Sequence, residues 1–260
     1  MPRIFLPIIS IYNNQISITG EKARYLLSVL RCKKGDGLIV FDGEGNNLRT
    51  KILKSDRREV IAEVIEKFTC DTESTVKILL VQGLLKGQKM DMVIQKATEL
   101  GVKEIIPVIT ERSQPRETRK VARWRKIAEE ASRQSGRTFI PIIHETVEFN
   151  KFFGKIGKLK VSGETVKQGH REKIGLICWE EGGLSLKDAV HKISSFPILR
   201  VSDSPIHLLI GPEGGFTKEE VDIAEGKGLI VTSLGKRILR AETAAISAIT
   251  LVQFLLGDLG

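Results

Sequence analysis

Two short segments near the C-terminus combine residue types that could bind a small ligand. Gly214 and Gly215 lie side by side after an apolar run, and the loop GKRILRAET, residues 235–243, carries Arg240 and Glu242. Glycines let backbone amides and carbonyls approach a ligand closely, which suits an adenine or a ribose recognised by main-chain groups. One loop is therefore rich in glycine and the other in charge, and both are candidates for a single pocket.

The elements around these loops predict how they are brought together. Residues 207–256 show an apolar strand, the glycine turn, a helix start, the short β-branched run LIVTSL, the charged loop and a long apolar helix. In open α/β sheets, ligands bind at the carboxyl ends of strands. Each loop directly follows a predicted strand, so we expect both loops at the same edge of a sheet.

A short internal sequence repeat supports a shared ligand site. Residues 174–190 resemble residues 206–222, since each has an apolar strand, Glu-Gly-Gly, one apolar residue, a hydroxyl residue and an acid three positions later. The hydroxyl residues are Ser185 and Thr217, and the acids are Asp188 and Glu220. This spacing is close to a helix capping box. If the two strands are close, both glycine turns face the same cleft.

The middle of the chain predicts a parallel sheet. Residues 76–84 form a continuous apolar run, as in a strand buried on both faces, and residues 102–110 form another. Between them, residues 89–101 predict a helix with one apolar face, formed by Met90, Val93, Ile94, Ala97 and Leu100, and a stop at Gly101. Strand, helix and strand with short connections indicate an α/β fold. A third strand is expected at residues 140–145.

The first 70 residues differ in character, because short alternating runs surround one predicted helix at residues 20–31. This pattern indicates a small barrel. The polar stretch at residues 71–75 is typical of a linker. We therefore expect two domains, residues 1–71 and residues 72–260. Residues 150–173 are rich in Lys and Gly without clear periodicity, which favours a surface excursion.

The charge distribution favours a polyanionic partner. The net charge is +9, and residues 112–137 contain nine basic and three acidic residues around Trp124. Such a block suits contact with an RNA backbone, although a solvated helix with Trp124 packed inward is the alternative. A second basic cluster lies beside the first helix. The residues predicted to contact RNA are Arg24, Arg31, Lys33, Arg112 and Arg137.

Several classes of protein are not supported by the sequence. The three cysteines and four histidines have no metal-ligand or disulfide spacing, so we expect no metal site and a reducing, cytoplasmic location. The N-terminus does not have the pattern of a signal peptide, and the longest uncharged stretch is too short for a bilayer. Neither GxGxxG, a phosphate-binding loop nor a nucleophile elbow is present.

Together, LLIGPEGGFTKEE and SLGKRILRAETAAISAI resemble the C-terminal motifs of the SPOUT methyltransferases. Within that superfamily, the chain is similar to the RsmE family of 16S rRNA uridine-N3 methyltransferases. Further matching motifs occur in the same order along the chain, namely VLRCKKGD, FDGEG, KMDMVIQKATELGVKEIIPVITERS and EEASRQSGR. The likeness covers nearly the whole chain, so it is more specific than any single motif.

This resemblance implies a PUA-like barrel at the N-terminus and an α/β domain with a deep trefoil knot. It also implies a homodimer that uses S-adenosylmethionine (SAM) to methylate uridine 1498 of 16S rRNA, free or in the assembled small subunit. The implied cofactor residues are Cys178, Trp179, Glu180, Ile210, Gly211, Pro212, Glu213, Gly214, Gly215, Ser233, Leu234, Gly235, Ile238, Leu239 and Thr243.

Two residues just past the cofactor loops are the catalytic candidates. Arg240 could bind the uracil carbonyl or a phosphate and stabilise a developing anion. Glu242 could accept the uridine N3 proton or orient the base, but an acid that caps the last helix is an equal alternative. Thr243 is a further candidate for that cap.

Two other functions would also fit a basic chain of this kind. One is a non-catalytic RNA-binding or ribosome-assembly factor, although such a protein has no use for intact cofactor loops. The other is a different SPOUT specificity, such as a tRNA 2′-O-methyltransferase, against which the additional N-terminal barrel argues.

Overall fold

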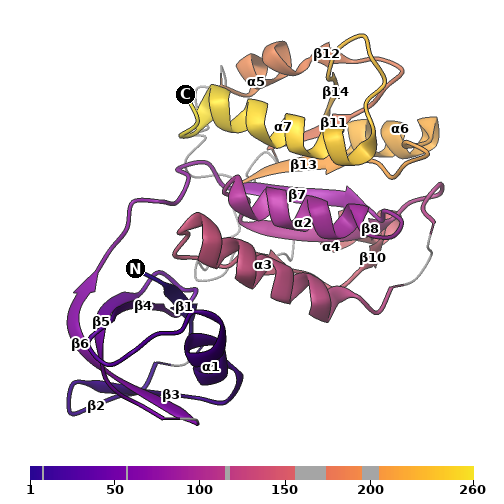
Figure 1. Cartoon of the computed structure of the whole chain (residues 1–260). Helices are drawn as coiled ribbons and strands as arrows, with labels where there is room; N and C mark the ends of the chain where they lie inside the picture. Colours follow the sequence, from indigo (N-terminus) through magenta and orange to yellow (C-terminus); the bar gives the residue numbers. More distant parts are fainter. Residues whose placement is uncertain (8, 57, 115–117, 156–173, 195–204) are drawn as a thin grey trace. The chain divides into compact units, whose positions relative to one another are not determined.

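The computed structural model describes residues 1–7, 9–56, 58–114, 118–155, 174–194 and 205–260. It divides into two compact units (Figure 1). The first comprises Met1–Glu73 with Glu129–Ile140, and the second comprises Ser74–Ala128 with Pro141–Gly260. The inclusion of Glu129–Ile140 in the first unit was not visible in the sequence, because this segment is separated from the rest of its unit by 55 residues of the other unit.

The first unit contains a six-stranded, mainly antiparallel sheet in the order β1-β4-β5-β6-β3-β2. Its strands are β1 (Arg3–Phe5), β2 (Ile11–Tyr12), β3 (Gln15–Thr19), β4 (Gly37–Phe41), β5 (Asn47–Ser55) and β6 (Glu59–Phe68). β1 pairs with β4 in parallel. Figure 1 shows the sheet strongly curved beside helix α1 (Gly20–Arg24). Two irregularities in the register of β5 with β6 fit this curvature, because bulges bend strands.

Alternation along the strands directs apolar side chains to one side of this sheet. In β3, for example, Ile16 and Ile18 are buried while their neighbours are exposed. Leu26 completes the core from the helical segment. The sequence predicted one regular helix at residues 20–31, but only its first turn is α-helical, and Tyr25–Val29 forms a π-helix. Apolar periodicity indicates a helix but does not distinguish these two hydrogen-bond patterns.

The second segment of this unit is held by a buried ion pair. Arg137 is 2% exposed, and its Nη2 donates to Glu73 Oε2 at 2.8 Å. The other carboxylate oxygen of Glu73 accepts hydrogen bonds from the backbone amides of Thr138 and Phe139. The prediction that Arg137 contacts RNA is therefore wrong, because its guanidinium is inside the unit and is paired with Glu73.

The second unit is built on a parallel sheet in the order β10-β8-β7-β13-β11-β14-β12, with β9 also paired to β8. The strands are β7 (Ile78–Gly83), β8 (Glu104–Ile109), β9 (Ile142–Ile143), β10 (Val147–Glu148), β11 (Ile174–Cys178), β12 (Leu184–Ser185), β13 (Ile206–Ile210) and β14 (Ile230–Ser233). β7 and β13 are buried along their whole length. This confirms the predicted α/β fold and the strand, helix and strand unit.

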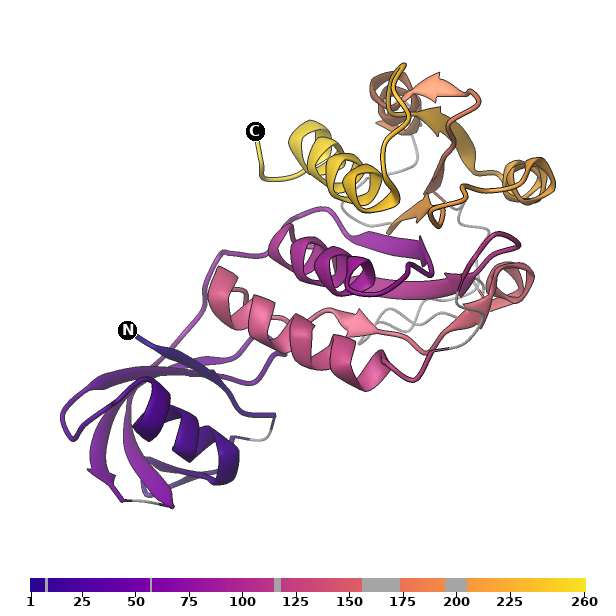
Figure 2. The same ribbon diagram turned by 45° about the vertical axis from the view of Figure 1, so that its right-hand side comes forward.

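Helices cover both faces of this sheet. Their bounds are α2 (Lys89–Glu99), α3 (Val121–Ser135), α4 (Phe149–Lys155), α5 (Leu186–Ser194), α6 (Lys218–Gly226) and α7 (Ala241–Leu256). The residues of α3 from Glu129 onwards are counted with the first unit. α7 packs on α2, α5 and β13, and it lies beside α2 in both ribbon views (Figures 1 and 2). No helix in the described residues has the length and apolarity needed to cross a membrane.

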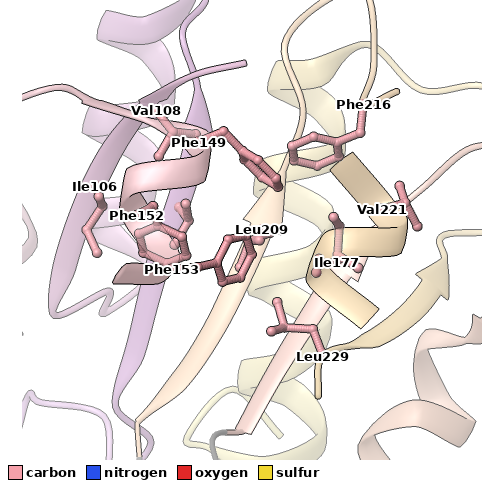
Figure 3. Packing of buried hydrophobic residues seen from close by; sticks show 12 residues of the cluster. Ile106, Val108, Phe149, Phe152, Phe153, Ile177, Leu209, Phe216, Val221 and Leu229 are labelled. Atoms are coloured by element: carbon pink, nitrogen blue, oxygen red, sulfur yellow. The ribbon is translucent and has the colours of Figure 1, made fainter. Parts of the chain in front are cut away.

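Figure 3 shows the core on the face covered by α4 and α6. Phe149, Phe152 and Phe153 of α4 are buried there with Phe216 and with side chains of the central strands. The sequence predicted a surface excursion from residue 150 onwards, but the apolar side of α4 packs in this core. The rest of that predicted excursion, residues 156–173, lies outside the described residues.

The apolar face of α2 agrees with the prediction, and Gly101 follows it in a left-handed conformation at φ +84°. Trp124 of α3 is 1% exposed, and its Nε1 donates to Asp91 of α2 at 3.1 Å. The alternative with Trp124 packed inward is therefore confirmed. A base of RNA has no access to this indole for stacking.

Candidate cofactor and catalytic site

The two strands of the internal repeat, β11 and β13, are neighbours in the sheet. β11 pairs with β13 in parallel, with Cys178 opposite Ile210, and β11 pairs on its other side with β14, where Cys178 is opposite Thr232. The loops that follow these three strands therefore start at one edge of the sheet. This is the arrangement that the sequence predicted for the glycine turn and the charged loop.

The three loops and the first turn of α7 line one pocket. It contains thirteen of the fifteen residues that the resemblance assigned to a cofactor: Cys178, Trp179, Glu180, Ile210, Gly211, Pro212, Glu213, Gly215, Ser233, Leu234, Gly235, Ile238 and Leu239. Gly214 and Thr243 are not in the wall. Arg237, which belongs to the predicted charged loop, is also in the wall, and so are Ala241 and Ala244, which were not predicted as cofactor residues.

The first glycine turn faces a different groove. Gly182 and Gly183 line an adjoining space that shares Glu180, Ser233 and Gly235 with the main pocket. Of the two glycine pairs, only the second therefore contributes to the main pocket, through Gly215, while the first lines the space beside it. Gly183 has φ +111°, and a side chain there would overlap the backbone of Val231, because this turn folds against the edge of β14 to form β12.

The second glycine turn is tightly folded against its neighbours. Gly215 has φ +70°, and its amide donates to Pro212 O at 3.0 Å. A Cβ on Gly215 would overlap the carboxylate of Glu180, and a Cβ on Gly211 would lie 3.1 Å from the Gly215 carbonyl carbon. Side chains at these positions would therefore change the shape of the pocket wall.

A buried polar side chain from β7 holds this turn. Gln82 at the end of β7 is fully buried, and its Nε2 donates to Gly83 O and Gly211 O, each at 3.1 Å. Sequence reasoning missed Gln82, although its amide within the apolar run of residues 78–84 was a detectable signal. Its Oε1 is buried and has no hydrogen-bond partner within the described structure.

Glu213 connects the turn to the loop before α2. Its Oε1 accepts a hydrogen bond from the Lys86 amide at 3.1 Å and from Lys89 Nζ at 3.0 Å. Burial acts to raise the pKa of Glu213, but these hydrogen bonds outweigh it, and its pKa lies below the ordinary value. Glu213 therefore lines the pocket while its carboxylate is engaged outside the turn.

Arg112, a predicted RNA ligand, also contacts this turn. Its Nη1 donates to Gly214 O at 3.0 Å and to Phe216 O at 3.3 Å. The other predicted RNA ligands that are accessible are Arg24, Arg31 and Lys33, which are all exposed on the first unit. Their contact with RNA stays a prediction.

Both predicted helix caps are present. Thr217 Oγ1 accepts from the Glu220 amide at 3.2 Å, and Glu220 Oε2 accepts from the Thr217 amide at 3.0 Å, which completes a capping box. Ser185 Oγ accepts from the Asp188 amide at 3.2 Å at the start of α5. The helices after the two glycine turns therefore begin at the residues that the sequence indicated.

The catalytic candidates lie at the start of α7, next in sequence to the wall residues Leu239 and Ala241, but neither candidate is itself in the pocket wall. Arg240 is the exposed N-cap residue, and its carbonyl accepts from the Ala244 amide at 2.8 Å. Glu242 is in the first turn, where its Oε2 is buried and has no hydrogen-bond partner in the described part of the chain. No side-chain hydrogen bond caps α7, so a cap by Thr243 is not seen, but Glu242 is the acid in the first turn of this helix. The alternative in which Glu242 stabilises the helix N-terminus therefore agrees with its position.

Cys178 at the end of β11 and the following residue, Trp179, both line the pocket. Burial raises the pKa of the Cys178 thiol to about 11, although a contact with Thr232 acts in the opposite direction. The thiol is therefore neutral near pH 7 and is a poor nucleophile. Trp179 presents a buried Nε1 without an acceptor within the described residues, so a ligand acceptor would satisfy it.

The chain matches two family models. One, described as an RNA methyltransferase domain, matches residues 72–253, and the other, described as an RNA methyltransferase PUA domain, matches residues 18–65. Among known proteins, the ribosomal RNA small subunit methyltransferase E of Synechocystis is 33% identical over 93% of this chain and 73% of its own length. The protein of the same name from Bacillus subtilis is 29% identical over 92% of this chain and 89% of its own.

Solved structures agree with these matches. A ribosomal RNA small subunit methyltransferase E from Neisseria gonorrhoeae, bound to SAM, covers 100% of both chains at 32% identity with a TM-score of 0.84. A Legionella pneumophila protein in complex with SAM covers 99% of this chain and 98% of its own at 31% identity and a TM-score of 0.82. The chain therefore belongs to the ribosomal RNA small subunit methyltransferase E family.

Proposed function

We propose that the protein transfers a methyl group from SAM to N3 of a uridine in small-subunit ribosomal RNA, at position 1498 of the 16S molecule. The observation that carries this proposal is the pocket at the ends of β11, β13 and β14, together with the SAM bound to the Neisseria and Legionella proteins. The reaction belongs in the cytoplasm, where ribosomal subunits are assembled, and it needs no metal ion.

The residues of the pocket fit SAM. The backbone of Ile210–Gly211 and the loop around Gly235 approach the pocket closely, which suits recognition of adenine and ribose by main-chain groups. The orphaned Nε1 of Trp179 can donate to an oxygen or nitrogen of the cofactor. When bound, SAM supplies an electrophilic methyl group on a sulfonium centre.

Glu242 is the candidate acceptor for the uridine N3 proton. A buried carboxylate oxygen without a donor is costly, so a hydrogen bond from a bound base to Glu242 Oε2 would be favourable. As the acid in the first turn of α7, Glu242 also interacts favourably with the partial positive charge at the N-terminus of this helix. Arg240, two residues earlier at the N-cap of α7 and exposed, can contact the uracil carbonyl or a phosphate.

We further propose that the backbone of the second unit is knotted and that the protein is a homodimer. In support of the knot, the chain passes from β13 to β14 on the far side of β11 and then returns to place α7 on β13 and α2. In support of the dimer, α7 exposes Leu251 at 41% and Phe254 at 59%, on a helix without charge after Glu242. Exposed apolar faces of this kind are typical of subunit interfaces.

The test of the reaction is transfer of a labelled methyl group from SAM to 16S rRNA that has not been modified, both free and in assembled small subunits. We expect the label in 3-methyluridine after digestion to nucleosides and mass spectrometry. Label in a 2′-O-methylated nucleoside would instead support another specificity. RNA binding without any transfer would support the assembly-factor alternative.

The fluorescence of Trp179 can be used to follow cofactor binding. The chain contains two tryptophans, and Trp124 is buried and hydrogen-bonded to Asp91, so only Trp179 lines the pocket. We expect titration with SAM to change the tryptophan emission with the same midpoint that calorimetry gives. Trp179→Phe should remove the optical change. If the change persisted in Trp179→Phe, SAM would bind elsewhere.

A further inference from the structure

The segment after β8 forms a buried, hydrogen-bonded turn between Thr110 and Ser113. The Thr110 amide donates to Ser113 Oγ at 3.0 Å, and the Ser113 amide donates to Thr110 O at 3.1 Å. Both residues are at most 1% exposed. Their closed, buried turn fixes the backbone from which the Arg112 side chain extends, so this side chain starts from a defined position.

Arg112 lies directly on the glycine turn. In addition to its hydrogen bonds to the carbonyls of Gly214 and Phe216, its aliphatic part is in contact with Gly214, where a Cβ would be 3.0 Å from Arg112 Cβ. Gly214 thus faces Arg112, whereas Gly215 faces the pocket. The two adjacent glycines have different tasks, since only the first accommodates the arginine.

Arg112 and the turn together fix one peptide plane. The carbonyl oxygen of Gly214 accepts from Arg112, and the amide of Gly215 in the same peptide donates to Pro212 O. Because a peptide group is planar, holding both ends defines the orientation of the whole group. Gly215 therefore presents its Cα to the pocket in a single arrangement.

Glu220 joins the same two segments on the other side. It is 7% exposed, its Oε1 accepts from the Glu111 amide at 2.9 Å, and its Oε2 accepts from the Thr217 amide at 3.0 Å. The segment after β8 and the turn that lines the pocket are thus connected both by Arg112 and by Glu220. A charged group that donates to, or accepts from, several backbone groups is a strong connection.

We infer that Arg112 and Glu220 are positioning residues that hold the glycine turn in the shape that binds the cofactor. This inference rests on the proposed function, because it concerns the affinity for SAM. It assigns to Arg112 a task different from the RNA contact expected from the basic block of residues 112–137. Arg112 acts through the turn and has no direct part in methyl transfer.

The test compares SAM binding and steady-state kinetics for Arg112→Ala and Arg112→Lys with those of the unchanged protein. Loss of the charge-assisted hydrogen bonds in Arg112→Ala is expected to weaken SAM binding about tenfold and to raise the KM for SAM similarly. The kcat at saturating SAM should change by less than about threefold, since no reacting group is removed. Arg112→Lys should recover part of the affinity, because an ammonium can donate to one carbonyl.

Lys126→Ala is the matched control, since Lys126 is an exposed basic residue of α3 outside the glycine turn. It removes the same charge and should leave SAM binding unchanged. Equal SAM affinity in Arg112→Ala and the unchanged protein, with a reduced RNA affinity in Arg112→Ala, would overturn the inference and restore Arg112 as an RNA ligand. Absence of SAM binding in the unchanged protein would instead refute the proposed function.

Glu220→Gln gives a second measurement that does not depend on the folding of Arg112→Ala. The amide keeps one acceptor oxygen, so one of the two connections to Glu111 and Thr217 is lost. We expect a fall in SAM affinity of about threefold or more, with the thermal unfolding midpoint as a check of folding. Unchanged SAM affinity in both Glu220→Gln and Arg112→Lys would contradict the inference.

Discussion

Glu242→Gln is expected to lower the maximal rate of methyl transfer by about 10²–10⁴-fold, the usual effect of removing a general base. The side chain keeps its size, so SAM affinity should remain within about twofold of the unchanged value. The physical reason is the orphaned Oε2 of Glu242, which is buried at the start of α7 beside the pocket residues Ala241 and Ala244. A glutamine amide cannot accept a proton, whereas it can still accept a hydrogen bond.

The pH–rate profile separates proton transfer from orientation of the base. If Glu242 accepts the N3 proton, the fall in rate toward low pH that reflects protonation of this carboxylate should disappear in Glu242→Gln. Glu225→Gln is the matched control, because Glu225 is exposed on α6 and lies outside the pocket wall. A profile of unchanged shape in Glu242→Gln would remove the assignment as base. Full activity in this variant would remove Glu242 from the catalytic site altogether.

The second large effect is expected for Gly83→Ala at the end of β7. A Cβ there would lie 2.5 Å from Pro212 N and 2.8 Å from the carbonyl carbon of Gly211. Both atoms are backbone atoms of the pocket wall, so β7 and the glycine turn would have to separate. We expect SAM affinity to fall more than about tenfold and the free energy of unfolding to fall by about 1–3 kcal/mol, as for an overpacked core.

Gly226→Ala makes the same chemical change at the end of α6, where nothing lies within 4 Å of the new methyl group. It should leave SAM affinity unchanged and stabilise the helix slightly. Calorimetric titration with SAM and thermal unfolding measure both variants. Wild-type SAM affinity in Gly83→Ala would show that the contact between β7 and the turn does not shape the cofactor site.

Much of the fold of the second unit could be predicted because it follows from local patterns. Continuous apolar runs identified β7 and β13, helical spacing identified α2, and a hydroxyl residue followed by an acid identified the starts of α5 and α6. The internal repeat identified two similar strands, and the structure showed that these strands, β11 and β13, are paired neighbours. These features depend on residues a few positions apart, so a single sequence contains them.

The tasks of individual charged residues required the tertiary structure. Arg112 and Arg137 belong to one basic block in the sequence, yet one donates to carbonyls 102 and 104 residues away and the other is buried against Glu73, 64 residues away. Local composition cannot separate a solvated arginine from one that pairs with a distant partner. For the same reason, the two Gly-Gly turns look equivalent in the sequence. In the structure, Gly183 packs on Val231, and Gly182 and Gly183 line the space beside the main pocket.

By itself, the sequence determined the fold class, the location of the pocket loops and the family resemblance, since turn glycines, caps and apolar periodicity are local properties of the chain. Only the tertiary structure decided which side chains support the pocket, namely Gln82, Arg112 and Glu220, and which catalytic candidate has an unsatisfied buried oxygen, namely Glu242. The physical reason is that burial and hydrogen-bond partners arise when segments distant in sequence are packed together.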